Sequence, residues 1–236
     1  MSNSAIPYVH LQVASGFSFK YGSAQPNQLV ERAATFGMPA LALTDRNALA
    51  GAIRFTQSCQ RAGITPIIGC NLEVAPTRKT KAAPTPAKGG NFVENNFSRV
   101  TVMATSQNHG WRNLVKMVSG VEEQLLTHEN FAQHSAGVLL LLGPNSDVGR
   151  ALASRRIDQA KAALNRWREL TEPGSIAVEV VSHLAPGEGA LTTAHAARSL
   201  IFANQMGISA VISNSVRMLD REDGPVVDIL DAARKL

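Results

Sequence analysis

The sequence lacks the features of a membrane protein or an exported protein. No apolar run reaches the length of about 18 residues that a membrane-spanning helix needs. The start, Met1-Ser2-Asn3-Ser4, has no basic stretch followed by an apolar core, so no secretory signal is visible. Cysteine is scarce, and Cys59 and Cys70 do not have the spacing of a zinc site. We therefore expect a cytoplasmic protein in which both thiols are reduced.

Positive charge is in excess, but the excess is local. The chain of 236 residues has a net charge of +5, and 44% of its residues are hydrophobic, which is ordinary for a globular protein. Four of the cations lie in the stretch 76–90, which contains no acid: Arg78, Lys79, Lys81 and Lys88. The net charge of the rest is only +1, which argues against a broad DNA-binding surface. The stretch 76–96 is rich in Pro, Gly and charge, which predicts a mobile surface loop.

Seven short apolar runs rich in β-branched residues follow one another along the chain, with helical patterns between most of them. The runs are 8–13, 39–44, 65–70, 99–105, 137–142, 175–181 and 209–213, and the helical patterns are 26–36, 48–62, 111–121, 157–170, 191–206 and 225–236. This alternation predicts an α/β fold of parallel strands joined by right-handed helical crossovers. Seven units can close a barrel, and an open doubly wound sheet is the alternative. The stretch 122–136 reads as an irregular connection.

Four motifs carry a family resemblance: His10-Leu11-Gln12, Thr44-Asp45-Arg46, Gly69-Cys70-Asn71 and Asn214-Ser215-Val216-Arg217. With other spaced blocks in the same order, the chain resembles the PHP (polymerase and histidinol phosphatase) domain that opens the alpha subunit of bacterial DNA polymerase III or its error-prone paralogue. The resemblance implies a distorted (β/α)7 barrel of the TIM-like PHP type, formed by residues 1–236 as a single domain. Its site would lie at the C-terminal ends of the strands.

In active relatives, about nine side chains at that end hold metal ions that activate water and clamp phosphate. The resemblance places the corresponding positions of this chain at one retained histidine and at eight poorer or different groups: His10, Gln12, Tyr21, Arg46, Asn71, Arg99, Pro144, Ser215 and Arg217. It places three further residues at the same cleft: Asp45, His183 and Asn214.

These substitutions predict a vestigial site with no metal, no cofactor and no catalytic residue. Arginine has no lone pair to offer and stays protonated, so Arg46 and Arg217 would repel a dication. We expect the two arginines to face each other across the former site. They could bind a phosphate or a partner's carboxylate. Alternatively, they fill the old cavity and pair with Asp45 and nearby carbonyl groups.

The resemblance implies a non-catalytic scaffold or docking domain of a DNA-directed DNA polymerase, a nucleotidyltransferase, that acts in replication or repair synthesis. This domain alone would then not be an enzyme, and the downstream polymerase domains are absent from these residues. The expected partners are those domains, a proofreading exonuclease subunit, and DNA through the parent protein. The helical pattern 225–236 has no Gly or Pro stop, so we expect the natural polypeptide to continue.

Two other functions stay open at this point. One is a metal-dependent phosphoesterase, either a 3′–5′ proofreading exonuclease or a histidinol-phosphatase-like enzyme, which would need the ligand set that is missing. The other is a DNA-binding module that uses the basic stretch 76–90, whose affinity would depend steeply on salt. The residues do not separate a replicative parent from an error-prone one.

Overall fold

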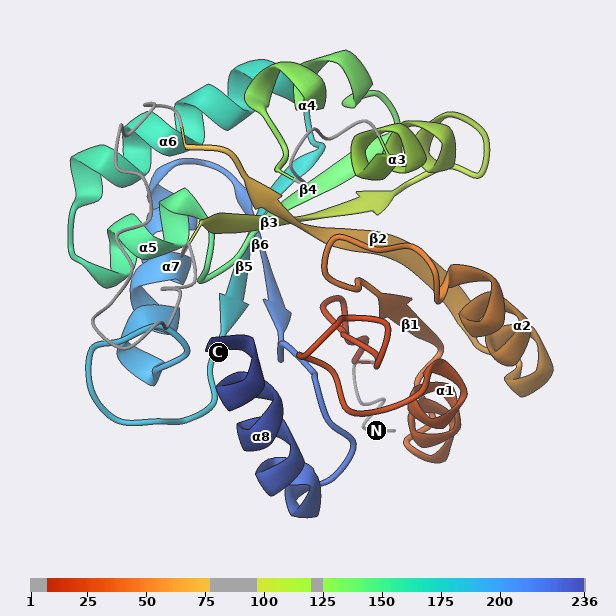
Figure 1. Ribbon diagram of the computed structural model, residues 1–236. Coiled ribbons are helices and arrows are strands. Elements are labelled where there is room, and N and C mark those ends of the chain that lie inside the picture. The colour runs from red at the N-terminus through yellow and green to blue at the C-terminus, as the bar shows by residue number, and fades with distance from the viewer. Residues whose placement is uncertain (1–7, 77–96, 120–124, 236) are drawn as a thin grey trace, which may run out of the picture.

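Six strands form one curled sheet with most of the helices on its outer side (Figure 1). The structure is a computed structural model that describes residues 8–76, 97–119 and 125–235. The strands lie in the sheet in chain order: β1 (Ala40–Leu43), β2 (Thr65–Val74), β3 (Ser98–Ala104), β4 (Val138–Leu142), β5 (Ile176–Val181) and β6 (Ser209–Ser213). Six of the seven predicted runs therefore form strands, and the predicted α/β class is confirmed.

All six predicted helical patterns form helices. They are α1 (Pro26–Thr35), α2 (Ala52–Ala62), α3 (His109–Ser119), α6 (Ile157–Leu170), α7 (Thr193–Gln205) and α8 (Gly224–Lys235). Helix α1 begins at a proline and buries Leu29, Val30 and Ala33 against the sheet side, as its spacing predicts. Helix α8 lies apart from the outer layer, near the ends of β5 and β6 (Figure 1).

The direction of one strand differs from the prediction. Strand β3 is antiparallel to both β2 and β4, whereas the pairs β1–β2, β4–β5 and β5–β6 are parallel. The hydrophobic pattern of a buried strand carries no information on its direction, so the expectation of an all-parallel sheet was wrong. The consequence for the site is direct, because the first residues of β3 lie beside the last residues of β2.

The first predicted run, 8–13, is not a strand in the structure. It makes an isolated parallel bridge between Val13 and Val216, and the Thr44 amide donates to the Val13 carbonyl at 2.8 Å. The Ala42 amide likewise donates to the His10 carbonyl at 3.0 Å. The run thus lies between β1 and the segment after β6, joined to each by a few backbone hydrogen bonds.

Two short helices were not predicted. Helix α4 (His128–His134) lies in the stretch expected to be irregular, with the Thr127 hydroxyl accepting from the Asn130 amide at its start. Helix α5 (Asp147–Ala153) follows β4, and a 3-10 turn, η2 (Arg221–Asp223), precedes α8. A helix of seven residues with one buried side chain, Phe131 in α4, is too short to show a periodic pattern.

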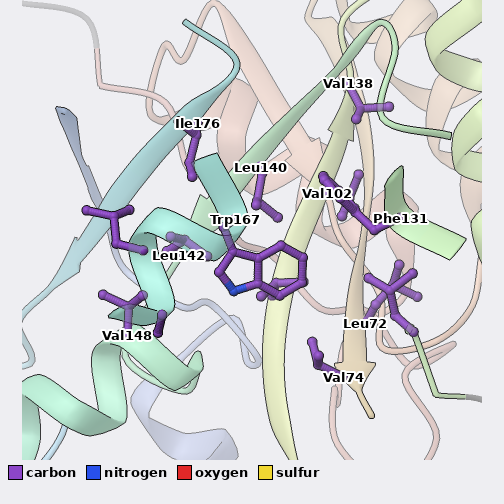
Figure 2. Close-up of a cluster of buried hydrophobic side chains, with 14 of the residues drawn as sticks. Leu72, Val74, Val102, Phe131, Val138, Leu140, Leu142, Val148, Trp167 and Ile176 are labelled. Atoms are coloured by element: carbon purple, nitrogen blue, oxygen red, sulfur yellow. The ribbon is translucent and has the colours of Figure 1, made fainter. Parts of the chain in front are cut away.

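The main core lies between the sheet and the helices α3 to α6 (Figure 2). Trp167 of α6 is fully buried there and contacts the Phe131 ring edge-to-face, with ring centroids 5.3 Å apart. Its indole nitrogen donates to the Asp147 carboxylate at 3.0 Å, so its polar group is satisfied. His128, the first residue of α4, stacks on Trp167 with ring centroids 4.4 Å apart.

The predicted loop 76–96 lies, from residue 77 on, outside the described residues. None of the helices in the described ranges has the length and apolar character needed to cross a membrane.

Candidate functional site

The ends of several strands meet at one end of the sheet, and most of the expected site residues lie there. Because β3 runs in reverse, Arg99 near its start pairs with Glu73 near the end of β2. Arg46 makes an isolated bridge with Asn71, which joins the loop after β1 to the same strand. We call this end the mouth and define it by the residues around its small central space: Gln12, Ala14, Tyr21, Thr44, Arg46, Asn71, Asn145, Ser215 and Val216.

Asp45 organises the loop after the first run and does not pair with an arginine. Its carboxylate is 1% exposed and accepts from the Ser15 amide at 2.6 Å and from the Ser18 hydroxyl at 2.7 Å. The Ser15 hydroxyl donates to it as well, at 2.9 Å. Burial raises the pKa of Asp45, and these hydrogen bonds oppose the rise. The expectation that Asp45 compensates the charge of Arg46 was therefore wrong.

Arg99 forms a buried network at a position where the resemblance would place a metal ligand. Its Nη1 lies 2.6 Å from Glu73 Oε1, and its Nε donates to Asn71 Oδ1 at 2.6 Å. Its Nη2 donates to the Asn71 carbonyl at 2.8 Å, and the Asn71 amide group donates to Thr101 Oγ1 at 2.9 Å. Burial lowers the pKa of Arg99, and Glu73 opposes this. Asn71 and Arg99 thus bind each other across β2 and β3.

Gln12 and Ser215 close another side of the mouth with neutral groups. The Ser215 hydroxyl donates to Gln12 Oε1, and Gln12 Nε2 donates to Thr101 Oγ1 at 3.5 Å. Ser215 has a left-handed backbone, with φ of 49°, at the turn that follows β6. These two positions would hold a histidine and an aspartate in active relatives, according to the resemblance, and here their polar atoms are bonded to each other.

The structure brings Arg46 and Arg217 together on the ring of Tyr21. The Cζ atom of Arg46 lies 3.3 Å from the ring centroid, and that of Arg217 lies 4.2 Å from it. Guanidinium groups at such distances gain from the electron-rich face of the ring. Burial lowers the pKa of Arg46 to about 10, and the charges of Arg99, Arg217 and Arg234 contribute to this.

The counter-charge comes from α8, which no motif includes. The two terminal nitrogens of Arg217 bind the two oxygens of Asp231, at 3.0 and 2.8 Å. Arg234 binds the same carboxylate at 2.8 Å. Lys20 donates to the Ala233 carbonyl at 2.6 Å, so the last turns of α8 are tied to the mouth at two points.

The remaining expected positions lie outside the central space. His10 lines a separate groove of about 230 Å³ against α1, and burial lowers its pKa. His183 is exposed, and its Nε2 bonds to the Asn214 carbonyl at 3.0 Å. Pro144 is buried beside Asn145, whose carbonyl accepts from the Arg99 amide at 2.9 Å.

This donor set does not fit a metal ion. The central space has a volume of about 10 Å³, which is room for about one water molecule. Within the described ranges, no group of three or more His, Cys, Asp or Glu side chains is placed to hold a metal. The nearest candidate oxygens, on Asn71 and Gln12, are bound to Arg99 and Ser215. The anion site expected at Arg46 and Arg217 likewise has no room while Asp231 is in place.

Three important residues were missed by reasoning from the sequence: Glu73, Glu179 and Asp231. The signal for Glu179 was present, because it is the one charged residue in the apolar run 175–181. It is 1% exposed, and within the described part of the chain neither carboxylate oxygen has a hydrogen-bond partner. No local pattern pointed to Asp231, whose partner Arg217 lies on another segment.

The sequence comparisons link this chain to bacterial DNA polymerases. The chain is 30% identical over 227 residues to the DNA polymerase III subunit alpha of Escherichia coli K12, which covers 92% of the chain and 18% of that protein. It is 30% identical over 252 residues to the error-prone DNA polymerase of Symbiobacterium thermophilum, covering 97% of the chain and 21% of the relative. The chain thus spans about a fifth of the length of these relatives.

The structure comparisons and the family match agree on the fold. An amidohydrolase from Chromobacterium violaceum, solved with sulfate bound and without metal, has a TM-score of 0.53 at 14% identity, covering 94% of this chain and 96% of that one. A protein named as a metal-dependent phosphoesterase, from Bifidobacterium adolescentis, has a TM-score of 0.53 at 14% identity, with coverages of 97% and 96%. The PHP domain family matches residues 10–183, well over half of the sequence. This chain therefore belongs to the PHP domain family.

Proposed function

We propose that this chain is a non-catalytic PHP domain of a DNA polymerase III alpha-like polymerase, where it acts as a scaffold or docking domain in DNA replication or repair synthesis. The relatives support this proposal, because the chain matches about a fifth of each polymerase. In such a protein the polymerase chemistry would belong to the other domains. Those domains, a proofreading exonuclease subunit, and DNA bound through the parent are the proposed partners, and the proposed location is the cytoplasm.

The single observation that supports a non-catalytic role is the bonding within the mouth. Arg46 and Arg217 stack on Tyr21, and Arg99 binds Asn71 and Glu73, so three guanidinium groups stand where ligands are expected. A guanidinium group offers no lone pair, and its charge opposes a dication. We further propose that the fold is a distorted (β/α)7 barrel forming a single domain, with the run 8–13 as an irregular seventh member beside β1.

The test is the metal content and the activity of the purified protein. We expect less than about 0.1 equivalent of zinc, manganese or iron by elemental analysis, and an unchanged melting temperature in EDTA, because an ion bound only to the native state would stabilise it. No hydrolysis of single-stranded DNA or p-nitrophenyl phosphate is expected in added Mn²⁺. Stoichiometric metal, together with hydrolysis that is lost in His10→Ala, would favour the alternative function, a metal-dependent phosphoesterase. One structural neighbour carries that name.

Restoring two of the expected ligands should not restore metal binding. In the double variant Asn71→Glu, Arg217→His, the new carboxylate would lie beside Arg99, whose Nε is 2.6 Å from the present Asn71 oxygen. It should therefore pair with Arg99, while Arg46 still opposes a dication. Calorimetric titration with Zn²⁺ and Mn²⁺ should give the same heats for the variant and the wild type, and a new site with micromolar affinity would contradict the prediction.

A further inference from the structure

Helix α8 is held to the mouth by polar contacts more than by packing. Among its described residues, Val227 is the only buried apolar side chain, whereas Val226 and Ile229 are 48% and 68% exposed. The helix is fastened by the Asp231 carboxylate and by the Ala233 carbonyl. Ion pairs that are partly exposed contribute little each, so the docked helix should be able to lift at a modest cost.

The Asp231 carboxylate is bound as an anionic ligand would be. Its two oxygens accept hydrogen bonds from the two terminal nitrogens of Arg217 in a paired, fork-like arrangement, and Arg234 adds a third contact. The planar fork of arginine matches a phosphate as well as it matches a carboxylate. Asp231 therefore occupies the position that a phosphate group would take on Arg217.

Arg46 supplies a neighbouring cation, whose charge helps to lower the pKa of Asp231. Its side chain stacks on Tyr21, but it makes no hydrogen bond or ion pair with any residue that the structure describes. Lys20 lies on the same side of the mouth, since it binds the end of α8. When α8 lifts, Lys20 and Arg217 lose the α8 groups that bind them. Asp45, the acid next to Arg46 in the sequence, is held by Ser15 and Ser18.

We propose that the mouth is a phosphate-binding site that the Asp231 side chain of α8 blocks. A phosphate group would displace Asp231 and bind Arg217 and Arg46. This goes beyond the scaffold role, because it gives the domain a ligand of its own. With α8 docked the central space has room for about one water, so the ligand binds only the form in which α8 has lifted. The ligand class is a phosphodiester of single-stranded nucleic acid or a free phosphate group.

The test measures binding of a fluorescein-labelled oligothymidylate of about ten nucleotides by anisotropy at low salt. Asp231→Asn should tighten binding about tenfold over wild type, because it removes the competing carboxylate and loosens α8. Asp228→Asn is the matched control: it makes the same change of charge on an exposed residue of the same helix, and should change binding less than twofold. Adding Arg217→Met to Asp231→Asn should abolish the gain.

Two further measurements separate the ligand sources and guard against misfolding. Inorganic phosphate at millimolar concentration should displace the oligonucleotide if the site takes a free phosphate group, and should not if it requires a phosphodiester chain. In the wild type, saturating ligand should speed hydrogen exchange of the α8 amides between Ile229 and Arg234, which needs no variant. Equal affinity of wild type, Asp228→Asn and Asp231→Asn, binding that survives Arg217→Met, or α8 amides unaffected by ligand would each overturn the proposal.

Discussion

Replacing Arg99 with methionine should lower the free energy of unfolding by about 3 to 5 kcal/mol. Arg99 is 7% exposed and binds Glu73 and both oxygens of Asn71. Methionine fills a similar volume but leaves the Glu73 carboxylate without its counter-charge in a largely buried place. Removal of one partner from a buried pair is costly for this reason, whatever the net contribution of the intact pair.

Urea denaturation at pH 7 measures this loss. Arg112→Met on the exposed face of α3 is the matched control, and should change the free energy of unfolding by less than about 0.5 kcal/mol. Adding Glu73→Gln to Arg99→Met should recover part of the loss, because the unpaired charge is gone. If Arg99→Met behaves like Arg112→Met, the network does not hold β2 and β3 together at the mouth.

Much of the fold could be predicted from the sequence because a helix or strand with one buried face has a periodic pattern of apolar residues. Six runs and six helical patterns form the expected elements, and most of them bury their apolar side, although α8 buries only Val227 among its described apolar residues. The direction of β3 gives no such pattern, because a strand buried on both faces has the same run of apolar residues whether it is parallel or antiparallel to its neighbours. The stretch 8–13 looks like a strand by composition, yet its backbone groups pair with neighbours only at isolated positions.

The sequence predicts which positions of the candidate site lack a metal ligand, but not which residues now contact those positions. The resemblance names the positions at which ligands are missing, and the structure places Arg46 and Asn71 at the mouth, with Arg99 bound to Asn71 and Arg217 stacked on Tyr21 beside them. The groups that now bind them come from elsewhere in the chain. Tyr21 was itself an expected position, but Glu73 on β2 and Asp231 on α8 were not. Such partners depend on tertiary structure, so spacing within a motif cannot reveal them.

Replacing Glu179 with glutamine should make the protein more stable at pH 8 than the wild type, by up to about 3 kcal/mol, and should give no such gain near pH 4.5. Burial raises the pKa of the Glu179 carboxyl from its ordinary 4.5 to about 7. The neighbouring Ser213 hydroxyl opposes this rise only in part, because it does not reach good hydrogen-bond geometry with either Glu179 oxygen. Gly143 leaves room for the carboxyl at the end of β4, where a β-carbon would clash with it.

The sign of the effect follows from proton binding. Between pH 4.5 and 7 the folded protein keeps the Glu179 proton that the unfolded chain has released, so the wild type loses stability as the pH rises through this range. Glutamine cannot lose a proton, so the variant avoids that loss. Burial also raises the pKa of Asp45 and lowers that of His195, but these contributions are common to both proteins and cancel in the difference.

Urea denaturation of both proteins at pH 5, 6, 7 and 8 measures the difference directly. The exposed Glu172→Gln is the control for removing one acid from the same region, and its difference from wild type should not change with pH. Tyr8 faces the same carboxyl, since the Glu179 charge helps to raise the pKa of its phenol, and Glu179→Gln should lower that pKa in a spectroscopic titration. A difference between Glu179→Gln and wild type that stays constant from pH 5 to 8 would mean that Glu179 is already ionised within the fold, and that an unseen partner compensates its charge.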